Sequence, residues 1–339
     1  MPKTQSDNRV HTALVGSGRF AQFLLRPMLQ QQATTSIDFI CEPSPKTYDA
    51  ACDIFREAGV QPPPNVPDFD QLIRDHAGQL DTIFILTPHA SHFSQAKASL
   101  EAGLDVLLQK PMVINAEEAQ KLIDIRNRTG KLLVVAFPGS LSPQIRTAVK
   151  LLRSGELGEI LSISAVVHEE WRKTNTGTWR QIPEIAGGGF FFDAGAHMLN
   201  TVCDLVGEDF AEVAAWLDNR GAPVEIRGVV MGRLRSGALV TLNGCGETNT
   251  PPSSEIRVIC TGGVLYTNNV GATLAVQRSG ERTPIPVEVP PSLGVWEQFL
   301  AVRAGKLENP CPPEVGLRMT RLWDAIRASA AQDGALVRM

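Results

Sequence analysis

The regular alternation of short apolar runs and helical patterns over roughly the first 140 residues constrains the fold more than any other feature. Five apolar runs are expected to form strands: Val10–Val15, Ile37–Cys41, Thr82–Leu86, Asp105–Leu108 and Leu132–Phe137. Four segments between them repeat apolar residues at helical spacing: Phe20–Gln31, Thr47–Ala58, Ser91–Ala102 and Ala116–Arg128. Such strands are typical of a parallel sheet covered on both faces, which binds ligands at the carboxyl ends of its strands. The sequence therefore predicts an α/β domain with a doubly wound parallel sheet over residues 1–138.

The sequence pattern changes after a further helix expected near Ile145–Arg153. Six later segments alternate as strands do: Ile160–Val167, Glu212–Trp216, Ile226–Leu234, Ala238–Leu242, Glu255–Cys260 and Thr273–Gln277. Glycine-containing turns at 235–237 and 261–263 are typical of hairpins. We therefore predict an α+β domain over residues 139–339 with a mostly antiparallel open sheet. Its cover is expected from three helical patterns: Asp193–Leu205, Leu293–Ala304 and Val315–Ala331.

Charge and cysteine content exclude several classes of protein. The net charge of -4 is spread over 339 residues without a basic block, so we expect neither a nucleic-acid nor a membrane partner. Six cysteines without a Cys-x-x-Cys pair argue against a zinc clip and a disulfide framework, and the histidines lack metal-ligand spacing. Residues 1–8 are polar, and no run approaches about 18 apolar residues. We therefore expect a cytoplasmic protein that binds no metal.

A nucleotide-binding turn is indicated directly after the first expected strand. Gly16 permits a tight turn there, Gly18 lets the backbone approach a pyrophosphate, and Ala21 is small enough for close helix packing. Glu42, at the end of the second strand, can accept the ribose hydroxyls of NAD and would repel the additional phosphate of NADP. Lys46 nearby leaves NADP possible. The alternative is a common glycine pair with Glu42 as a solvated loop residue.

A carboxylate and an imidazole stand four residues apart after the glycine run Gly187–Gly189. On one helix, that spacing would place Asp193 and His197 on the same face. Removal of a hydroxyl proton requires a base whose pKa lies near the working pH, and histidine meets this requirement. We interpret His197 as that base and Asp193 as the group that orients it. The alternative is that Asp193 caps a helix and His197 is a core histidine.

Lys110 directly follows an expected core strand and therefore lies at the binding edge of the sheet. An ammonium group there could polarise a substrate oxygen. The alternative is a solvent-facing lysine before a helix whose first turn contains Pro111.

Two tryptophan–arginine pairs flank a polar loop before the glycine run. Indoles at Trp171 and Trp179 can stack on sugar faces, and the guanidinium groups of Arg172 and Arg180 can bind hydroxyl, carboxylate or phosphate groups. Alternatively, both tryptophans anchor the loop by packing.

Four segments together resemble the Gfo/Idh/MocA family of oxidoreductases: Gly16–Ala21, Thr87–His92 followed by Ala102-Gly103, Gln109–Pro111, and Gly187–Gly189 leading to Asp193–His197. The resemblance covers nearly the whole chain. It implies an N-terminal Rossmann domain that binds NAD or NADP, and a C-terminal domain that binds substrate and forms a homodimer or homotetramer through its open sheet. It also implies catalytic roles for Lys110, Asp193 and His197. The cofactor site implied by the resemblance and the turn comprises Gly16, Gly18, Arg19, Phe20, Glu42, Thr87, Pro88, His92, Gln109 and Lys110.

The chain departs from this family at two places. Gln109 replaces the usual glutamate and removes a negative charge beside Lys110, and the segment 137–143 lacks the arginine-rich character often found there. We expect hydride transfer between the nicotinamide and a sugar, polyol or cyclitol. Two alternatives stay open: glycosidic cleavage by transient oxidation with bound NAD, and a cofactor-sensing regulator without catalysis.

Overall fold

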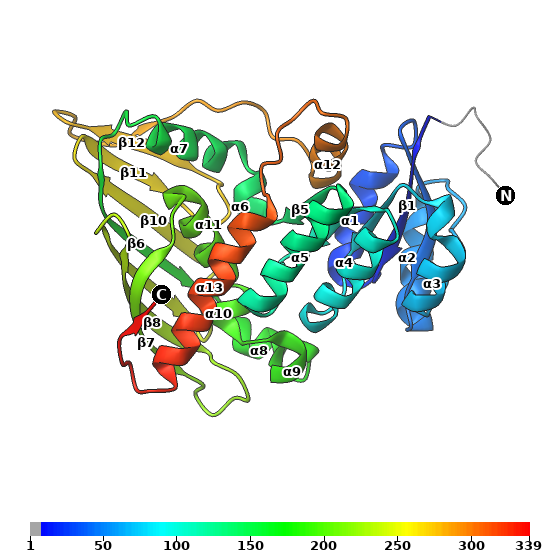
Figure 1. The fold of residues 1–339 in the computed structure, drawn as a ribbon, viewed down its shortest axis with the longest axis horizontal. Helices are drawn as coiled ribbons and strands as arrows, with labels where there is room; N and C mark the ends of the chain where they lie inside the picture. Colours follow the sequence, from blue (N-terminus) through cyan, green and yellow to red (C-terminus); the bar gives the residue numbers. More distant parts are fainter. Residues whose placement is uncertain (1–7) are drawn as a thin grey trace. The chain divides into compact units, whose positions relative to one another are not determined.

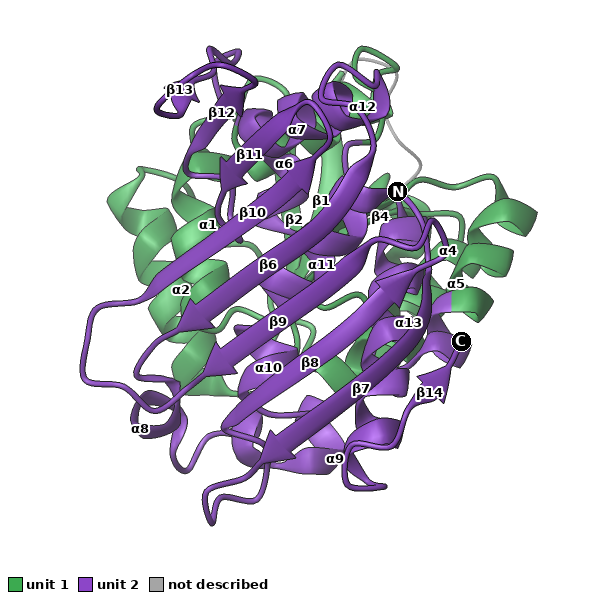
Figure 2. Cartoon of the chain, turned by 90° about the vertical axis from the view of Figure 1, so that its left-hand side faces the viewer, with its two compact units in different colours: residues 1–112, 120–136, 294–309 green, residues 113–119, 137–293, 310–339 purple. Residues whose placement is uncertain are grey.

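The computed structural model describes residues 8–339, which divide into two compact units. The first unit contains the chain up to Met112 together with residues 120–136 and 294–309, and the second contains residues 113–119, 137–293 and 310–339 (Figure 1, Figure 2). Within the described residues, no helix is both long and apolar enough to cross a membrane.

The first unit is built on five parallel strands in the order β2-β1-β3-β4-β5. The strands are β1 (Val10–Val15), β2 (Thr35–Cys41), β3 (Thr82–Ile85), β4 (Asp105–Gln109) and β5 (Leu133–Ala136). The helices are α1 (Arg19–Leu29), α2 (Pro45–Glu57), α3 (Phe69–His76), α4 (His92–Glu101), α5 (Ala116–Thr129) and α12 (Val295–Arg303), with short 3₁₀ turns at Ala77–Gln79 and His89–Ser91. This sheet confirms the predicted doubly wound domain. The strand order reverses between β1 and β3, which is where such sheets bind ligands.

Local signals explain where these helices begin. The Ser44 hydroxyl accepts a hydrogen bond from the Thr47 amide at 3.3 Å, and Pro45 opens α2. The Asp68 carboxylate caps α3 through the Gln71 amide at 2.8 Å. The sequence analysis did not include α3, a helix of eight residues in which Phe69, Leu72 and Ile73 are the apolar positions and Leu72 is the buried one.

The predicted boundary at residue 138 needs a correction, because α12 returns to the first unit. The Trp296 ring stacks on Phe84 of β3 at 6.3 Å between centroids, and its indole donates to the Thr35 hydroxyl at 2.8 Å. Arg303 donates to the Asp105 carboxylate at 2.9 Å. An apolar surface on the first sheet thus requires a cover that comes from late in the sequence.

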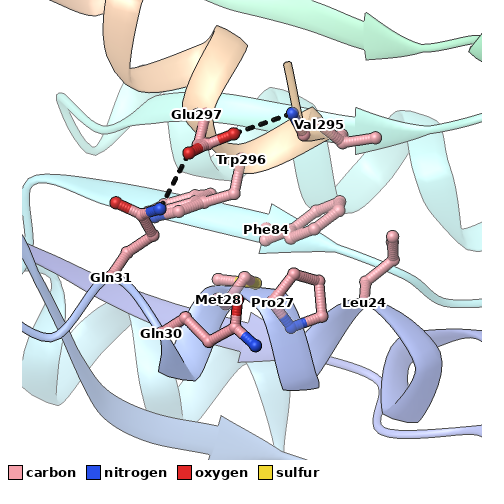
Figure 3. Close-up of a pocket in the computed structure, with 10 residues that line it drawn as sticks. Leu24, Pro27, Met28, Gln30, Gln31, Phe84, Val295, Trp296 and Glu297 are labelled. Carbon is pink, nitrogen blue, oxygen red and sulfur yellow. Dashed lines mark hydrogen bonds between the residues drawn. The ribbon is translucent and has the colours of Figure 1, made fainter. Parts of the chain in front are cut away.

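A small cavity lies where α12 meets α1 (Figure 3). Apolar side chains line most of it, among them Leu24, Met28 and Phe84, and Gln31 donates to Glu297 at its rim at 2.9 Å. The cavity holds about 80 Å³, far less than the ~300–1,000 Å³ of ordinary ligand pockets. It is therefore a packing gap at α12 and no candidate for the cofactor.

The second unit contains a nine-stranded sheet in the order β13-β12-β11-β10-β6-β9-β8-β7-β14 (Figure 2). The strands are β6 (Ile160–His168), β7 (Phe210–Asp218), β8 (Arg227–Leu234), β9 (Leu239–Cys245), β10 (Ser253–Cys260), β11 (Gly263–Thr267), β12 (Leu274–Arg278), β13 (Ile285–Pro286) and β14 (Val337–Arg338). Only the pair β6–β9 is parallel among the named strands, which confirms a mostly antiparallel sheet. The prediction lacked β11, β13 and β14.

Helices pack on one face of this sheet and leave the other face open (Figure 2). The helices are α6 (Pro138–Leu141), α7 (Pro143–Arg153), α8 (Trp171–Asn175), α9 (Pro183–Ala186), α10 (Phe190–Asp193), α11 (Ala196–Val206) and α13 (Pro313–Ala330), with a 3₁₀ turn at Trp179–Gln181. Of these, α13 packs against β7, α11 against β6, and α10 against β8 and β9. Apolar side chains nevertheless stay exposed on the open face, including Trp216, Val229, Met231 and Leu239.

Glycines in β8 and β9 let the short helix α10 pack directly on the sheet. A Cβ atom on Gly244 would lie 2.6 Å from the Phe191 ring, and one on Gly228 would lie 3.4 Å from the same ring. Gly246, just after β9, makes the same room for Phe190. Both phenylalanine rings are fully buried, so the glycines fix the height of α10 above the strands.

We predict that Gly244→Ala destabilises the second unit by about 1–3 kcal/mol, because the added methyl overpacks a buried ring that has no room to move. Urea unfolding monitored by circular dichroism measures this change. Gly78→Ala is the control, since a Cβ atom there meets nothing within 4 Å, and its effect should stay below about 0.5 kcal/mol. Equal effects of the two substitutions would contradict the packing argument.

Candidate functional site

The turn after β1 has the backbone geometry that the glycine pattern predicts. Gly16 has a φ of +87°, and a Cβ atom there would lie 3.0 Å from the carbonyl group of Leu86. Gly18 caps α1 with an extended backbone, and a Cβ atom there would meet nothing within 4 Å. Only glycine therefore fits position 16, whereas the space around position 18 is open to a ligand. The amide groups of the first turn of α1 suit a phosphate group.

Glu42 is tied directly to this turn. Its side chain is 8% exposed, and Oε2 accepts hydrogen bonds from the Ser17 amide at 2.8 Å and the Ser17 hydroxyl at 3.2 Å. Oε1 accepts from the Ser44 amide at 3.0 Å. The alternative of a solvated loop residue is therefore wrong. Ser17, which the motif leaves unspecified, connects the carboxylate to the turn.

His92 joins the loops that follow β3 and β4. Its Nδ1 lies 2.8 Å from the Pro111 carbonyl oxygen, and its Nε2 lies 2.9 Å from the Thr87 carbonyl oxygen. Burial lowers the pKa of His92, and nearby Lys110 lowers it further, against the opposing effect of these carbonyl contacts. The ring is fully buried and holds the two loops together, and its place in the cofactor site stays a prediction. The Thr87 hydroxyl, expected in the cofactor site, donates to Gln95 at 2.6 Å.

Gln109 ends β4 and Lys110 follows it with a partly exposed side chain. The Lys110–Pro111 peptide bond is cis, and Pro111 precedes the start of α5 by five residues, so it opens no helix. Gln109 Oε1 accepts from the Lys110 amide at 2.7 Å, whereas its buried Nε2 has no hydrogen-bond partner among the described residues. A buried amide donor at the carboxyl end of a central strand fits an acceptor atom of a bound nucleotide.

In the second unit, Asp193 is the centre of a polar cluster. The carboxylate is 6% exposed, and its Oδ2 accepts from the Trp171 indole at 2.8 Å and from Arg180 Nε at 3.0 Å. Trp171 is 1% exposed and cannot present its ring to a sugar, so the packing alternative is correct for this residue. The guanidinium of Arg180 also lies 4.5 Å above the centre of the half-buried Trp179 ring. A charge held by an indole and a guanidinium is strongly oriented.

Arg172 does not belong to this cluster. Its guanidinium pairs with Glu247 in the loop after β9 at 2.7 Å, and its amide donates to the Gly246 carbonyl at 2.8 Å. The predicted substrate arginines therefore occupy two different places in the second unit.

Asp193 and His197 do not lie on one regular α-helix, which corrects the simple spacing argument. Asp193 ends α10 and His197 is the second residue of α11. Between them, the Gly195 amide donates to the Phe190 carbonyl five residues back at 2.8 Å, in a turn that separates the two helices. The His197 ring meets the edge of Phe137 at 6.0 Å between centroids. The orientation of His197 by Asp193 stays a prediction.

Among residues 8–339, no cluster of three or more His, Cys, Asp or Glu side chains is arranged to hold a metal ion. Sequence reasoning overlooked two other residues of interest. Asn65 accepts from the Glu42 amide at 3.1 Å and donates to its carbonyl at 2.9 Å, and Glu225 binds the glycine run. Neither belongs to a motif. The sequence offers one signal for Glu225, which is that this acid stands between the apolar residues Val224 and Ile226.

Comparison with known proteins agrees with this geometry. Residues 10–137 match the oxidoreductase family with an NAD-binding Rossmann fold, and residues 145–266 match the GFO/IDH/MocA C-terminal domain. Oxidoreductase P35 of Formosa agariphila is 24% identical over 94% of this chain and 98% of its own. Levoglucosan dehydrogenase of Pseudarthrobacter phenanthrenivorans is 29% identical over 47% of this chain and 42% of its own.

A solved structure extends the likeness in fold to the full length. The inositol dehydrogenase homolog of Azotobacter vinelandii, complexed with NAD⁺, superimposes with a TM-score of 0.82 at 19% identity and covers 100% of both chains. The two matching family models fall on the two halves of the chain in the order that the motifs indicate. The chain belongs to the Gfo/Idh/MocA family of oxidoreductases and carries its NAD-binding Rossmann domain.

Proposed function

We propose that this protein transfers hydride between NAD, or NADP, and a carbinol or carbonyl group of a sugar, polyol or cyclitol. The observation that carries the proposal is the buried Asp193 carboxylate beside the glycine run, which Trp171 and Arg180 hold in place. A desolvated, oriented carboxylate is suited to accept hydrogen bonds from substrate hydroxyls. The relatives support the same substrate class, since one is named a levoglucosan dehydrogenase and another an inositol dehydrogenase homolog.

Each proposed catalytic residue has a separate task. The nicotinamide, when bound, supplies the hydride acceptor or donor. His197 takes the hydroxyl proton as the substrate is oxidised, a task for which imidazole needs little change of its pKa. Lys110 stabilises negative charge on the substrate oxygen, and Asp193 orients the substrate or the imidazole. Arg180 then acts by fixing Asp193, which refines its predicted role in substrate binding.

The proposed cofactor site uses the turn of the first unit. Gly16, Gly18 and the start of α1, including Arg19 and Phe20, would hold the pyrophosphate, and Glu42 would accept the ribose hydroxyls. Glu42 accepts three hydrogen bonds in the structure, and an ionised carboxylate has about four acceptor positions. This capacity and its negative charge support NAD as the preferred cofactor. Thr87, Pro88 and the amide of Gln109 complete the proposed site.

We also propose that the protein forms a homodimer or homotetramer through the open face of the nine-stranded sheet. Register places Trp216 opposite Val229, and Met231 lies one pair further along the same face. Charged pairs border this apolar surface, including Glu212 with Arg233 at 2.9 Å. An apolar centre with a charged rim is typical of protein interfaces.

We predict that Glu42→Gln weakens NADH binding about tenfold and shifts the preference toward NADPH, because a neutral amide loses the charge-assisted bonds and no longer repels a phosphate. Fluorescence titration with each nucleotide measures both constants. Glu57→Gln is the control, since Glu57 is an exposed acid of α2 that pairs with Arg26. An unchanged ratio of the two affinities would refute the assignment of Glu42.

His197→Ala is expected to lower kcat by about 10²–10⁴-fold and leave the NADH affinity unchanged, because proton transfer is lost while the cofactor site stays intact. Initial rates with a panel of sugars and polyols, together with NADH titration, measure both quantities. His168→Ala is the control; His168 ends β6, and its ring hydrogen-bonds the Thr250 hydroxyl in the loop after β9. Retained turnover in His197→Ala would reject His197 as the base. Turnover of the wild type without net NADH release would reject simple dehydrogenation.

Met231→Asp is expected to separate the oligomer into smaller species without unfolding it, because the side chain is 51% exposed in the single chain and a buried charge would oppose association. Light scattering coupled to size exclusion measures the mass. Phe23→Asp, at an apolar residue of α1 that is 71% exposed, should leave the mass unchanged. An unaltered mass for the Met231 variant would exclude this face as the interface.

A further inference from the structure

Glu225 is a buried acid whose contacts are with the backbone of the glycine run. The residue is 7% exposed and lies two positions before β8. Its Oε1 accepts a hydrogen bond from the Gly189 amide at 2.5 Å, and its main-chain carbonyl accepts from the Phe190 amide at 2.8 Å. The backbone amides of Phe191 and Phe192 also favour the ionised carboxylate and lower the pKa of Glu225. A Cβ atom on Gly189 would collide with the Glu225 carbonyl, so only glycine permits this approach.

These amides form the start of α10, the four-residue helix that ends at Asp193. A carboxylate at a helix N-terminus satisfies amides that the helix leaves unpaired and interacts favourably with its dipole. Gly189 connects the two acids directly, because its amide donates to Glu225 and its carbonyl accepts from the Asp193 amide at 2.8 Å. A change in the hydrogen bonding of Glu225 therefore acts within one helical turn on the backbone that carries Asp193.

A cavity of about 460 Å³ adjoins Glu225. Glu225, Gly187 and Gly188 form part of its lining. The charged groups that face it from neighbouring elements are Glu184 on α9 and Arg327 on α13, and the latter pairs with Asp324 at 2.5 Å. Glu225 is thus an acid that lies beside a cavity and is connected to Asp193 through the hydrogen bonds of Gly189.

We propose that Glu225 is a positioning residue whose protonation controls how firmly α10 holds Asp193 against Trp171 and Arg180. The ionised carboxylate accepts several amide hydrogen bonds and fixes α10. The protonated carboxyl group loses charge and acceptor strength, and α10 becomes less constrained. The consequence for catalysis rests on the proposed function of Asp193, whereas the structural coupling does not.

The direction of the pH dependence follows from burial. Burial raises the pKa of Glu225 from 4.5 to about 7, against the opposing effect of the backbone hydrogen bonds. Because the pKa in the folded state lies above that of the unfolded chain, the group's contribution to stability is complete below about pH 4.5. It is lost as the pH rises through about 7. Above about pH 7, the ionised Glu225 therefore fixes α10 best, although its contribution to the stability of the whole protein is lowest there.

The indole N–H of Trp171 reports the position of Asp193, since it donates to that carboxylate. The chain contains five tryptophans, so ¹⁵N-labelled indole groups give few NMR signals, and Trp171→Phe assigns the relevant one. We expect this signal to shift with a midpoint near pH 7 in the wild type and to lose that inflection in Glu225→Gln. Glutamine keeps an acceptor for the Gly189 amide, so this variant should fold.

Two further variants separate Glu225 from other groups that titrate nearby. Glu184→Gln removes an acid from the same cavity and should leave the midpoint unchanged, and the inflection should persist in His197→Gln. The melting temperature of Glu225→Gln should fall less than that of the wild type between pH 5 and 8. No inflection in the wild type, or an unchanged one in Glu225→Gln, would overturn the proposal.

An activity profile adds a separate readout. The kcat profile of Glu225→Gln should change shape near pH 7 and retain the inflection that the proposed base His197 contributes, while the KM for the cofactor stays constant. If the chain turned over no sugar or polyol, the proposed function would fail while the NMR result would still decide the role of Glu225.

Discussion

Burying a carboxylate is strongly unfavourable unless donors surround it, and three acids of this chain, one in the first unit and two in the second, meet this condition. Glu42 accepts from Ser17 and Ser44, Asp193 from an indole and a guanidinium, and Glu225 from the Gly189 amide just before α10. Two of the three act on glycine-containing backbone, where no side chain keeps the acid away. The glycines therefore expose backbone amides to the buried carboxylates as well as to a ligand, and these amides stabilise the buried charge.

The local features of the chain were predictable from sequence because they depend on neighbouring residues. The strands of the first unit appear as apolar runs, and the positive φ of Gly16 follows from a turn between a strand and a helix. Features that depend on distant contacts were not predictable. Trp171 looks like a possible stacking platform in sequence, and only the folded chain shows its ring buried and bonded to Asp193.

The geometry around His197 illustrates the same limit at short range. Regular helical spacing places Asp193 and His197 on one face, but the tight contact of Gly195 with the Phe191 backbone accompanies a bond that spans five residues. Phe191, in the same turn, packs on Gly228 of β8 and Gly244 of β9. Contacts with the sheet therefore matter more here than the local helical repeat. Glu225 also reaches α10 through a distant contact, and its segment contains no motif that predicts this.

The return of α12 to the first sheet has a consequence for how the protein is made. Thr35, Phe84 and Asp105 emerge from the ribosome long before Trp296 and Arg303, which bond or cover them. Domains generally begin to fold as they are synthesised, from the N-terminus onward. Here the Rossmann unit cannot complete its core until translation has passed residue 309, so its early nascent form exposes an apolar surface that chaperones can recognise.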